Sequence, residues 1–296
     1  MKKIFTFSAI CIAGFAFSQS LNTKETNEKF STGSQNAIVT TIHENNANDV
    51  ISEWKSVLKD FKNEKVKEND NEVFGDNILI KDWGNNPVDF YTKFEEDKKA
   101  KTVKMSVAVD LGGSYLSSSA DKDKFKFVEK MVKDFAVKIT KEPILAAVKA
   151  SEKQLEKLQD NQKNLEKDNK NLKEDIENYK KKITKAEKEI VERDAEIEKK
   201  KAEVKVQKKV VDASSDAVSE QAKSSKKILE KLEDQLKDLE KDKKNSKEDI
   251  EDNKKKITKD EKEIKTNEED QVKKKDEIEA QIKVVNDTKK KLDAIN

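Results

Sequence analysis

The sequence is poor in the residues that most often build chemical sites. Among its 296 residues there is one cysteine, one histidine, two prolines and six glycines. The cysteine, Cys11, lies in an apolar segment near the N-terminus, so the rest of the chain can form neither a disulfide nor a cysteine-ligated metal site. The histidine, His43, has no second histidine or cysteine to accompany it. We therefore predict no metal site and read His43 as a surface or turn residue.

An excess of charge of one sign is also missing. Although 42% of the residues are charged, the formal net charge is only +2, so no overall field attracts nucleic acid. Arg193 is the single arginine, and the lysine runs alternate with acids. Because phosphate and base recognition favours the planar fork of arginine, we predict no nucleic-acid partner. The hydrophobic content of 33% indicates elongated helices rather than one compact core.

Residues 1–18 are typical of a signal peptide. Two lysines precede an apolar run over 4–17, and small residues at Ala16 and Ser18 favour cleavage before Gln19. The apolar run is too short to span a bilayer comfortably, so we predict no transmembrane segment after cleavage. The signal peptide is of the bacterial type, so the expected location of the protein is the periplasm, the cell surface or the medium. Whether the protein is released or attached to the envelope stays open.

Composition divides the rest of the chain near its middle. All glycines lie at or before Gly113, no phenylalanine follows Phe135, and both prolines precede the second half. We predict a flexible, polar leader over 19–36, a small α+β domain over 37–143, and a helical rod over 144–296.

Hydrophobic periodicity defines the elements of the small domain. Alternation is clearest over 102–111, and Asn48 is a plausible N-cap for the first helix. The predicted strands are 37–42, 73–80, 88–95 and 102–111, and the predicted helices are 49–61 and 121–140. This order predicts an α+β fold, a two-layer sandwich in which an antiparallel sheet carries two helices on one face. The order of the strands in the sheet stays open.

Aliphatic residues recur every seven positions in the second half, which predicts a coiled coil. The predicted heptad core consists of Leu155, Leu158, Leu165, Leu172, Ile176, Ile183, Ile190, Ile197, Val204, Leu229, Leu232, Leu236, Leu239, Ile250, Ile257, Ile264 and Ile278. The pattern starting at Leu155 returns 74 residues later at Leu229, so the rod is a tandem duplication with copies over about 155–228 and 229–296, the second truncated.

Two architectures satisfy this repeat. One helix could continue to the C-terminus and self-associate as a parallel homodimer, or the copies could fold back as an intramolecular antiparallel hairpin. No glycine or proline marks a turn, and only 212–225 is rich in serine and alanine. A hairpin would also place isoleucines opposite Asn253, Asp260 and Asn267. The pattern therefore leans towards the continuous helix, while the hairpin stays open.

Short motifs in the small domain are explained more simply by local structure than by a ligand-binding or catalytic site. Gly112–Ser114 lacks a nucleotide fingerprint and predicts a strand-ending turn. Two acidic segments, Asn69–Glu72 and Asp121–Asp123, lack the ligand spacing of a calcium-binding loop. They are explained better as solvated turns and helix caps. Trp54 lies on a helical apolar stripe and is expected in the core, whereas Trp83, in a turn, is the candidate for an exposed contact. We predict no catalytic residue, no cofactor and no enzyme.

These patterns favour an exported structural or interaction protein of the bacterial cell envelope. The rod would act as a spacer or oligomerisation element, and the small domain would bind an envelope protein that the sequence does not identify. The alternative is a ligand-binding or enzymatic N-terminal domain tethered by the rod. A concave pocket surrounded by polar side chains would favour that alternative.

Overall fold

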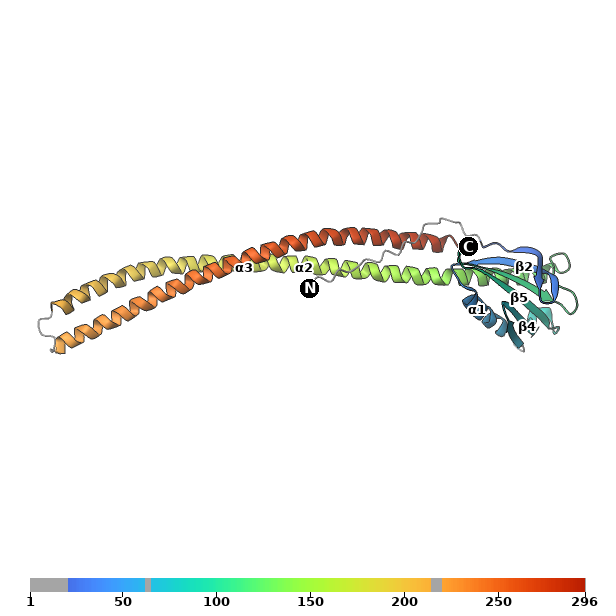
Figure 1. The fold of residues 1–296 in the computed structure, drawn as a ribbon, viewed down its shortest axis with the longest axis horizontal. Coiled ribbons are helices and arrows are strands. Elements are labelled where there is room, and N and C mark those ends of the chain that lie inside the picture. Colours follow the sequence, from blue (N-terminus) through green and yellow to red (C-terminus); the bar gives the residue numbers. More distant parts are fainter. Residues whose placement is uncertain (1–20, 62–64, 214–219, 296) are drawn as a thin grey trace. The chain divides into compact units, whose positions relative to one another are not determined.

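The structure is a computed structural model that describes residues 21–61, 65–213 and 220–295. The predicted signal peptide lies outside the described residues. The chain divides into two compact units. Unit 1 combines Met1–Leu155 with Ala280–Asn296, and unit 2 is Glu156–Glu279. The predicted α+β class is confirmed, since a sheet is followed by two long helices (Figure 1).

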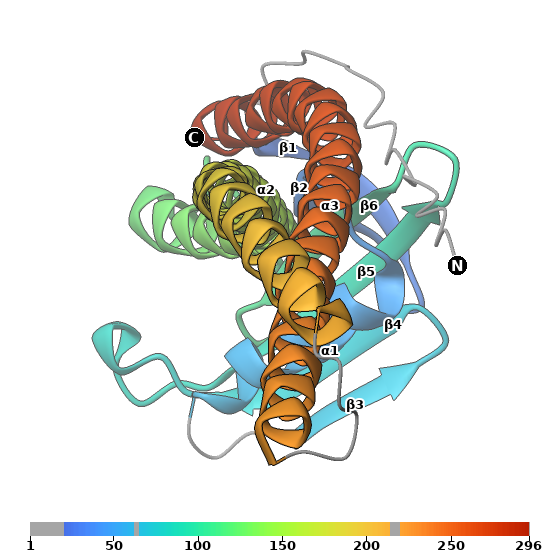
Figure 2. The same cartoon turned by 90° about the vertical axis from the view of Figure 1, so that its left-hand side faces the viewer.

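Six antiparallel strands form a single sheet in unit 1. The elements are β1 (Lys24–Phe30), β2 (Gly33–His43), α1 (Ala47–Lys59), β3 (Lys65–Asn69), β4 (Glu72–Ile78), the 3-10 helix η1 (Lys81–Trp83), β5 (Val88–Asp97), β6 (Thr102–Asp110), α2 (Lys122–Asp212) and α3 (Glu220–Asp293). The order across the sheet is β1-β2-β6-β5-β4-β3, which Figure 2 shows in projection.

The two edge strands were not predicted from the sequence. Residues 19–36 were expected to be a flexible leader, but β1 pairs with β2 from Lys24, opposite Val39, to Phe30, opposite Gly33. The leader prediction is therefore wrong for this segment. Neither β1 nor β3 alternates clearly in hydrophobicity, because an edge strand is held by backbone pairing along one side. Their charged side chains suit an edge that must not pair with another chain.

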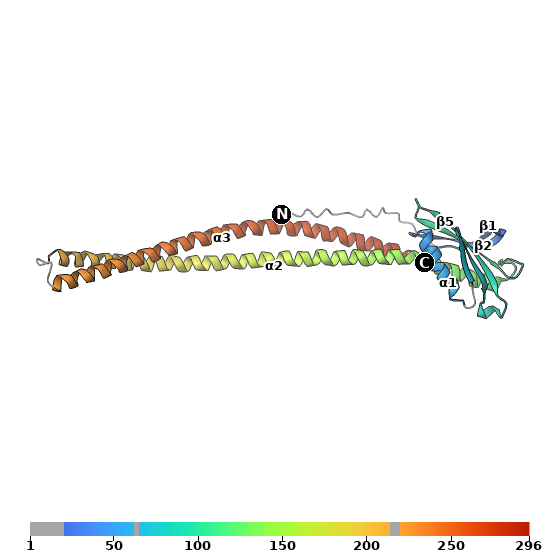
Figure 3. The ribbon, with the colours of Figure 1, turned by 60° about the horizontal axis from the view of Figure 1, so that its bottom comes forward.

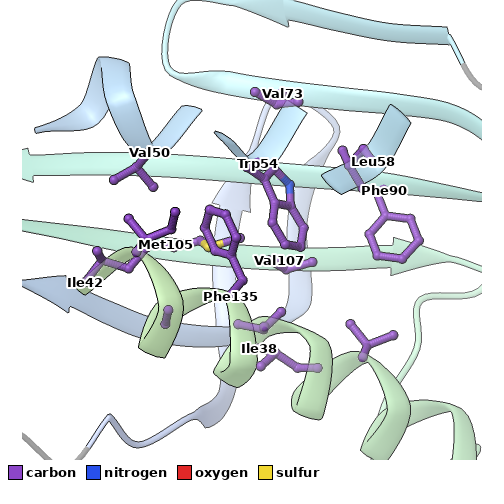
Figure 4. Close-up of a cluster of buried hydrophobic side chains, with 14 of the residues drawn as sticks. Ile38, Ile42, Val50, Trp54, Leu58, Val73, Phe90, Met105, Val107 and Phe135 are labelled. Carbon is purple, nitrogen blue, oxygen red and sulfur yellow. The ribbon is translucent and has the colours of Figure 1, made fainter. Parts of the chain in front are cut away.

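The main core lies between the sheet and two helices on one of its faces. Figure 4 shows α1 and α2 over the strands, with Trp54 and Phe135 directed towards them. Helix α1 buries Val50, Trp54 and Leu58, which share one face at helical spacing. The cap of α1 differs from the predicted one. Asn46, not Asn48, accepts the hydrogen bond from the backbone N–H of Asp49 (3.0 Å).

Helix α2 continues through Pro143, where the sequence predicts a domain boundary. Proline has no N–H, so the carbonyl oxygen of Ile139 lacks its usual helical donor. The side chain of Asn45 replaces this donor, since its Nδ2 donates to the Ile139 oxygen at 2.8 Å. The helix therefore crosses the predicted boundary without a break, and the two units divide after Leu155.

The end of the chain belongs to unit 1 rather than to a separate rod. Ile295 is 1% exposed and joins the main core, with Leu292 packed against it. The neighbouring part of α3 also binds α2, because Gln281 donates to the carbonyl of Ser151 (2.9 Å). The small domain is thus completed by residues that the sequence pattern assigns to the rod.

In unit 2 the helices α2 and α3 lie side by side and run in opposite directions (Figure 3). Lys173 forms an ion pair with Glu268 at 3.2 Å, and Lys208 forms one with Glu233 at 2.9 Å. Residues farther towards the C-terminus of α2 thus contact residues farther towards the N-terminus of α3, as in an antiparallel pair of helices. The continuous helix favoured by the sequence is wrong, and the hairpin alternative describes this chain.

The seam of the hairpin coincides with the heptad pattern. Every residue of the predicted heptad core is buried or half-buried. Polar residues occupy part of the seam, since Asn169, Ser246 and Asp260 are also buried. The register of the ion pairs places Asp260 near the level of Ile183, as expected for a hairpin. Coiled-coil winding of the two helices stays a prediction.

We expect a short bismaleimide to link Lys173→Cys to Glu268→Cys within one chain, because these side chains form an ion pair in the hairpin. Cys11→Ser would remove the native thiol. The measurement is the mass of the product under denaturing conditions. The control combines Lys173→Cys with Lys244→Cys. Position 244 lies about 36 Å from position 268, towards the N-terminus of α3, at 1.5 Å per residue. A product containing two chains would instead support the parallel dimer.

Candidate functional site

The sheet has a second face, opposite the helices. Along β6, side chains alternate between the main core and this open face, which carries Lys104, Ser106, Ala108 and Asp110. A small apolar cluster lies there, separate from the main core. The helices in the described part of unit 1 contribute no residue to this cluster. The described helices of unit 1 therefore leave this face of the sheet uncovered, and the partly buried Tyr91 and Tyr115 lie over the buried cluster.

The floor of the cluster is formed by three neighbouring strands. Phe30 of β1, Ala37 of β2 and Ala108 of β6 are 4%, 2% and 1% exposed. Tyr91 and Tyr115 pack around them and are half-buried. The small alanine side chains leave room for the tyrosine rings to lie across the sheet. The rings are thereby fixed on a rigid base.

Three aromatic side chains form a continuous row, here called the aromatic strip, of Phe74, Tyr91 and Tyr115. The ring centroids of Phe74 and Tyr91 are 4.8 Å apart, and those of Tyr91 and Tyr115 are 6.1 Å apart. These separations are typical of contacting aromatic pairs. A shallow cavity of about 290 Å³ adjoins the strip and is lined by Ser31, Lys67, Asn69, Glu72, Val73, Phe74 and Tyr91.

Carboxylates surround one end of the strip. Burial raises the pKa of the Tyr91 hydroxyl, and Tyr115, Asp89, Asp110 and Asp76 raise it further through their charges. The hydroxyl therefore stays protonated and able to donate. None of the three aspartates forms an ion pair with a described residue. Lys65 lies opposite Asp76 in the sheet, so three carboxylates face one lysine and this end of the open face has a negative net charge.

Two of these aspartates are held by backbone amides. Oδ1 of Asp89 accepts from the N–H of Asn77 at 2.9 Å. Oδ1 of Asp110 accepts from the N–H groups of Gly112 and Gly113 at 2.9 and 2.7 Å. Both glycines have positive φ, which their lack of a side chain permits. The turn after β6 thus fixes a carboxylate beside the strip, and it is the strand-ending turn that the sequence predicts.

The charges towards the other end of the open face compensate one another. Lys104 Nζ lies 2.8 Å from Glu28 and 3.2 Å from Glu95, and Lys93 lies 3.0 Å from Glu95. The hydrogen bond from Lys93 lowers the pKa of Glu95, and the hydrogen bond to Glu28 raises the pKa of Lys104. These groups are therefore matched with one another, unlike Asp76, Asp89 and Asp110.

The two residues singled out by the sequence lie elsewhere. Trp83, expected to be an exposed contact, is half-buried against the helical layer, with its ring centroid 5.6 Å from that of Phe127. Lys124 Nζ lies 5.6 Å from the Trp83 ring. His43 ends β2 and is also half-buried; burial lowers its pKa, whereas Glu44 raises it. Neither belongs to the aromatic strip.

The acidic motifs act locally. Asp121 accepts from the backbone N–H of Lys124 at 3.1 Å and caps the start of α2. In the described ranges, no group of three or more histidine, cysteine or acidic side chains is arranged to hold a metal ion.

Sequence reasoning missed the strip because alternation assigns its positions to the polar face. Phe90 and Phe94 of β5 face the main core, and Tyr91 between them lies on the opposite face. An aromatic residue at a position expected to be polar was the available signal. Tyr115 lies beyond the end of β6, so periodicity could not place it.

No helix among the described residues has both the length and the apolar character needed to cross a membrane. Comparison of the sequence with protein-family models gave no match, and comparison with curated proteins gave none either.

Proposed function

We propose that this chain is an exported interaction protein of the bacterial cell envelope that binds another protein through the aromatic strip. The observation that carries the proposal is the row of Phe74, Tyr91 and Tyr115 on an open sheet face. Aromatic side chains on a rigid base supply much of the binding energy in protein interfaces. Export rests on the sequence of residues 1–18.

The chemistry beside the strip defines the kind of partner. Asp76, Asp89 and Asp110 form no ion pair with described residues and create a negative potential next to the rings. A lysine or arginine of the partner would gain both charge pairing and contact with an aromatic face. We infer a protein surface that presents an apolar side chain next to a positive charge.

The hairpin of unit 2 suits the role of a spacer. Unit 2 contains 57 residues of α2, from Glu156 to Asp212, which correspond to about 85 Å at 1.5 Å per residue. Its seam is narrow and includes buried polar residues such as Asn169 and Asp260. Such a pair of helices provides length along the helix axis rather than strong individual contacts.

The enzymatic alternative has less support. The cavity beside the strip, about 290 Å³, is at the small end of ligand pockets, which hold roughly 300–1,000 Å³. Its lining has lysine, glutamate, serine and asparagine side chains but no histidine or cysteine. None of its charged groups is held in a buried acid–base pair. We therefore propose binding rather than catalysis at this face.

A photo-crosslinking amino acid at position 74 is expected to capture a discrete protein in envelope fractions, because Phe74 lies in the strip. The matched control carries the same amino acid at Lys133, an exposed position on α2. Adding Tyr91→Ser and Asp89→Asn to the position-74 variant should reduce the adduct at least about ten-fold, as expected for loss of an aromatic anchor and its charge.

Two results would contradict this function. One is equal capture from positions 74 and 133, and the other is absence of any protein adduct from position 74. Sequencing the N-terminus of the same purified protein tests export separately. The expected first residue is Gln19, and an intact Met1 in the cytoplasm would remove the envelope from the proposal.

A further inference from the structure

A second surface, independent of the aromatic strip, lies where α2 ends and α3 begins. Ala202, Val206 and Val210 are all exposed and follow one another at intervals of four, so they form one row along α2. Val206 is 64% exposed and Val210 is 46% exposed. On α3, Ile228 is 48% exposed and Leu232 follows it one turn later, half-buried.

These two rows lie on the same side of the hairpin. Val206 and Leu232 line one shallow groove of about 480 Å³, together with Lys199, Ala202, Glu203 and Gln207. Because the helices are antiparallel, the step from Val206 to Val210 runs in the same direction as the step from Leu232 to Ile228. We call the resulting surface of Ala202, Val206, Val210 and Ile228 the tip patch.

The charge of the chain changes sign around the tip patch. Residues 204–229 contain six lysines and three acidic residues, whereas the remainder of 156–279 contains 29 basic and 33 acidic residues. Three lysines lie beside the patch. Lys209 and Lys227 immediately precede Val210 and Ile228, and Lys199 lines the groove.

None of these three lysines forms an ion pair with a described residue. Elsewhere in unit 2 many lysines pair along their own helix, as Lys180 does with Glu177 at 3.0 Å. Glu203 lines the same groove and feels the charge of Lys199, but Lys209 and Lys227 have no carboxylate within ion-pair distance among the described residues. Aliphatic side chains and lysines without a close ion-pair partner thus occur together on one flank of the hairpin.

We propose that the tip patch docks on an anionic lipid surface. Exposed aliphatic side chains next to lysines enter the boundary between headgroups and acyl chains, while the lysines attract anionic headgroups. The patch is a poor contact for a second copy of itself, because two positive surfaces would meet. An acidic protein surface is the competing occupant, and the lipid test separates the two.

The test is co-sedimentation of the chain beginning at Gln19 with vesicles, since the apolar residues before it would bind lipid themselves. The probes are vesicles of phosphatidylcholine with 30% phosphatidylglycerol and vesicles of phosphatidylcholine alone. We expect at least about ten-fold tighter binding to the anionic vesicles at 0.1 M salt and most of this preference to be lost at 0.5 M.

Substitutions then locate the contact. Lys209→Gln with Lys227→Gln should weaken binding about 25-fold, since each lysine near an anionic surface contributes about five-fold. Val206→Ser with Ile228→Ser should weaken it about ten-fold. Helix content and the urea midpoint are measured for each variant, so that loss of binding is separated from loss of structure.

Matched controls come from the same hairpin. Lys167→Gln with Lys241→Gln removes two charges at the same heptad positions, away from the patch. Val191→Ser with Val272→Ser removes two valines that are 70% and 60% exposed. Both double variants should bind as the parent chain does. Equal effects of patch and control variants, equal affinity for the two vesicle types, or no vesicle binding would each overturn the proposal.

Discussion

Replacing Trp54 with alanine is expected to lower the free energy of unfolding of the small domain by about 3–5 kcal/mol. The indole is fully buried, its Nε1 donates to the hydroxyl of Thr92 at 2.8 Å, and its ring meets that of Phe135 edge-on at 4.9 Å. The substitution leaves a cavity where α1, α2 and β5 meet, and Thr92, itself fully buried, loses its partner. Since a domain is stable by only about 5–15 kcal/mol, this loss is a large fraction.

The measurement is urea unfolding followed by the fluorescence of Trp83, the only tryptophan left in this variant. Trp83→Ala is the matched control, read through Trp54. The Trp83 side chain is half-buried, so we expect a loss of about 1–2 kcal/mol. Equal losses for the two variants would mean that Trp54 does not hold the layers together.

Replacing Ile295 with aspartate is expected to destabilise unit 1 by about 3 kcal/mol. The side chain is 1% exposed in the main core, and burying an unpaired carboxylate there is unfavourable enough to expel the end of the chain. Expulsion forfeits the burial of one large aliphatic side chain, about 1.5–3 kcal/mol, and loosens Leu292 beside it. Urea unfolding gives the free energy, and hydrogen exchange over 280–295 shows whether this segment has detached.

Ile282→Asp serves as the control because Ile282 also belongs to the C-terminal part of unit 1, on α3, but is 40% exposed. It should change the free energy of unfolding by less than about 0.5 kcal/mol. If Ile295→Asp proved equally mild, the C-terminal segment would not be part of the domain.

Periodicity predicted the elements that bury a complete face. Alternation over 102–111 located β6, and helical spacing from Val50 to Leu58 located α1. It missed β1 and β3, which occupy the edges and are stabilised by backbone pairing that leaves little trace in the side chains. Periodicity also predicted that the second helix ends before Pro143. The helix continues because Asn45, 98 positions before the proline, donates the hydrogen bond that the proline cannot.

The candidate site was less accessible to prediction than the fold. The aromatic strip joins side chains of β4, β5 and the segment after β6, and their proximity depends on strand order. No local pattern encodes that order. The sequence instead pointed to Trp83, whose turn is folded back against Phe127.

The sequence by itself determined the α+β class, and it predicted a seven-residue seam and a duplication after 74 residues, because each depends on spacing along one segment. Tertiary structure alone decided how the duplicated helices pair. Ion pairs along the seam each contribute only tenths of a kcal/mol, so charge counting left the continuous helix and the hairpin nearly balanced. Burial of Ile295 in the core built by the first part of the chain requires α3 to return, and this contact joins residues too distant in sequence for any periodic pattern to reveal.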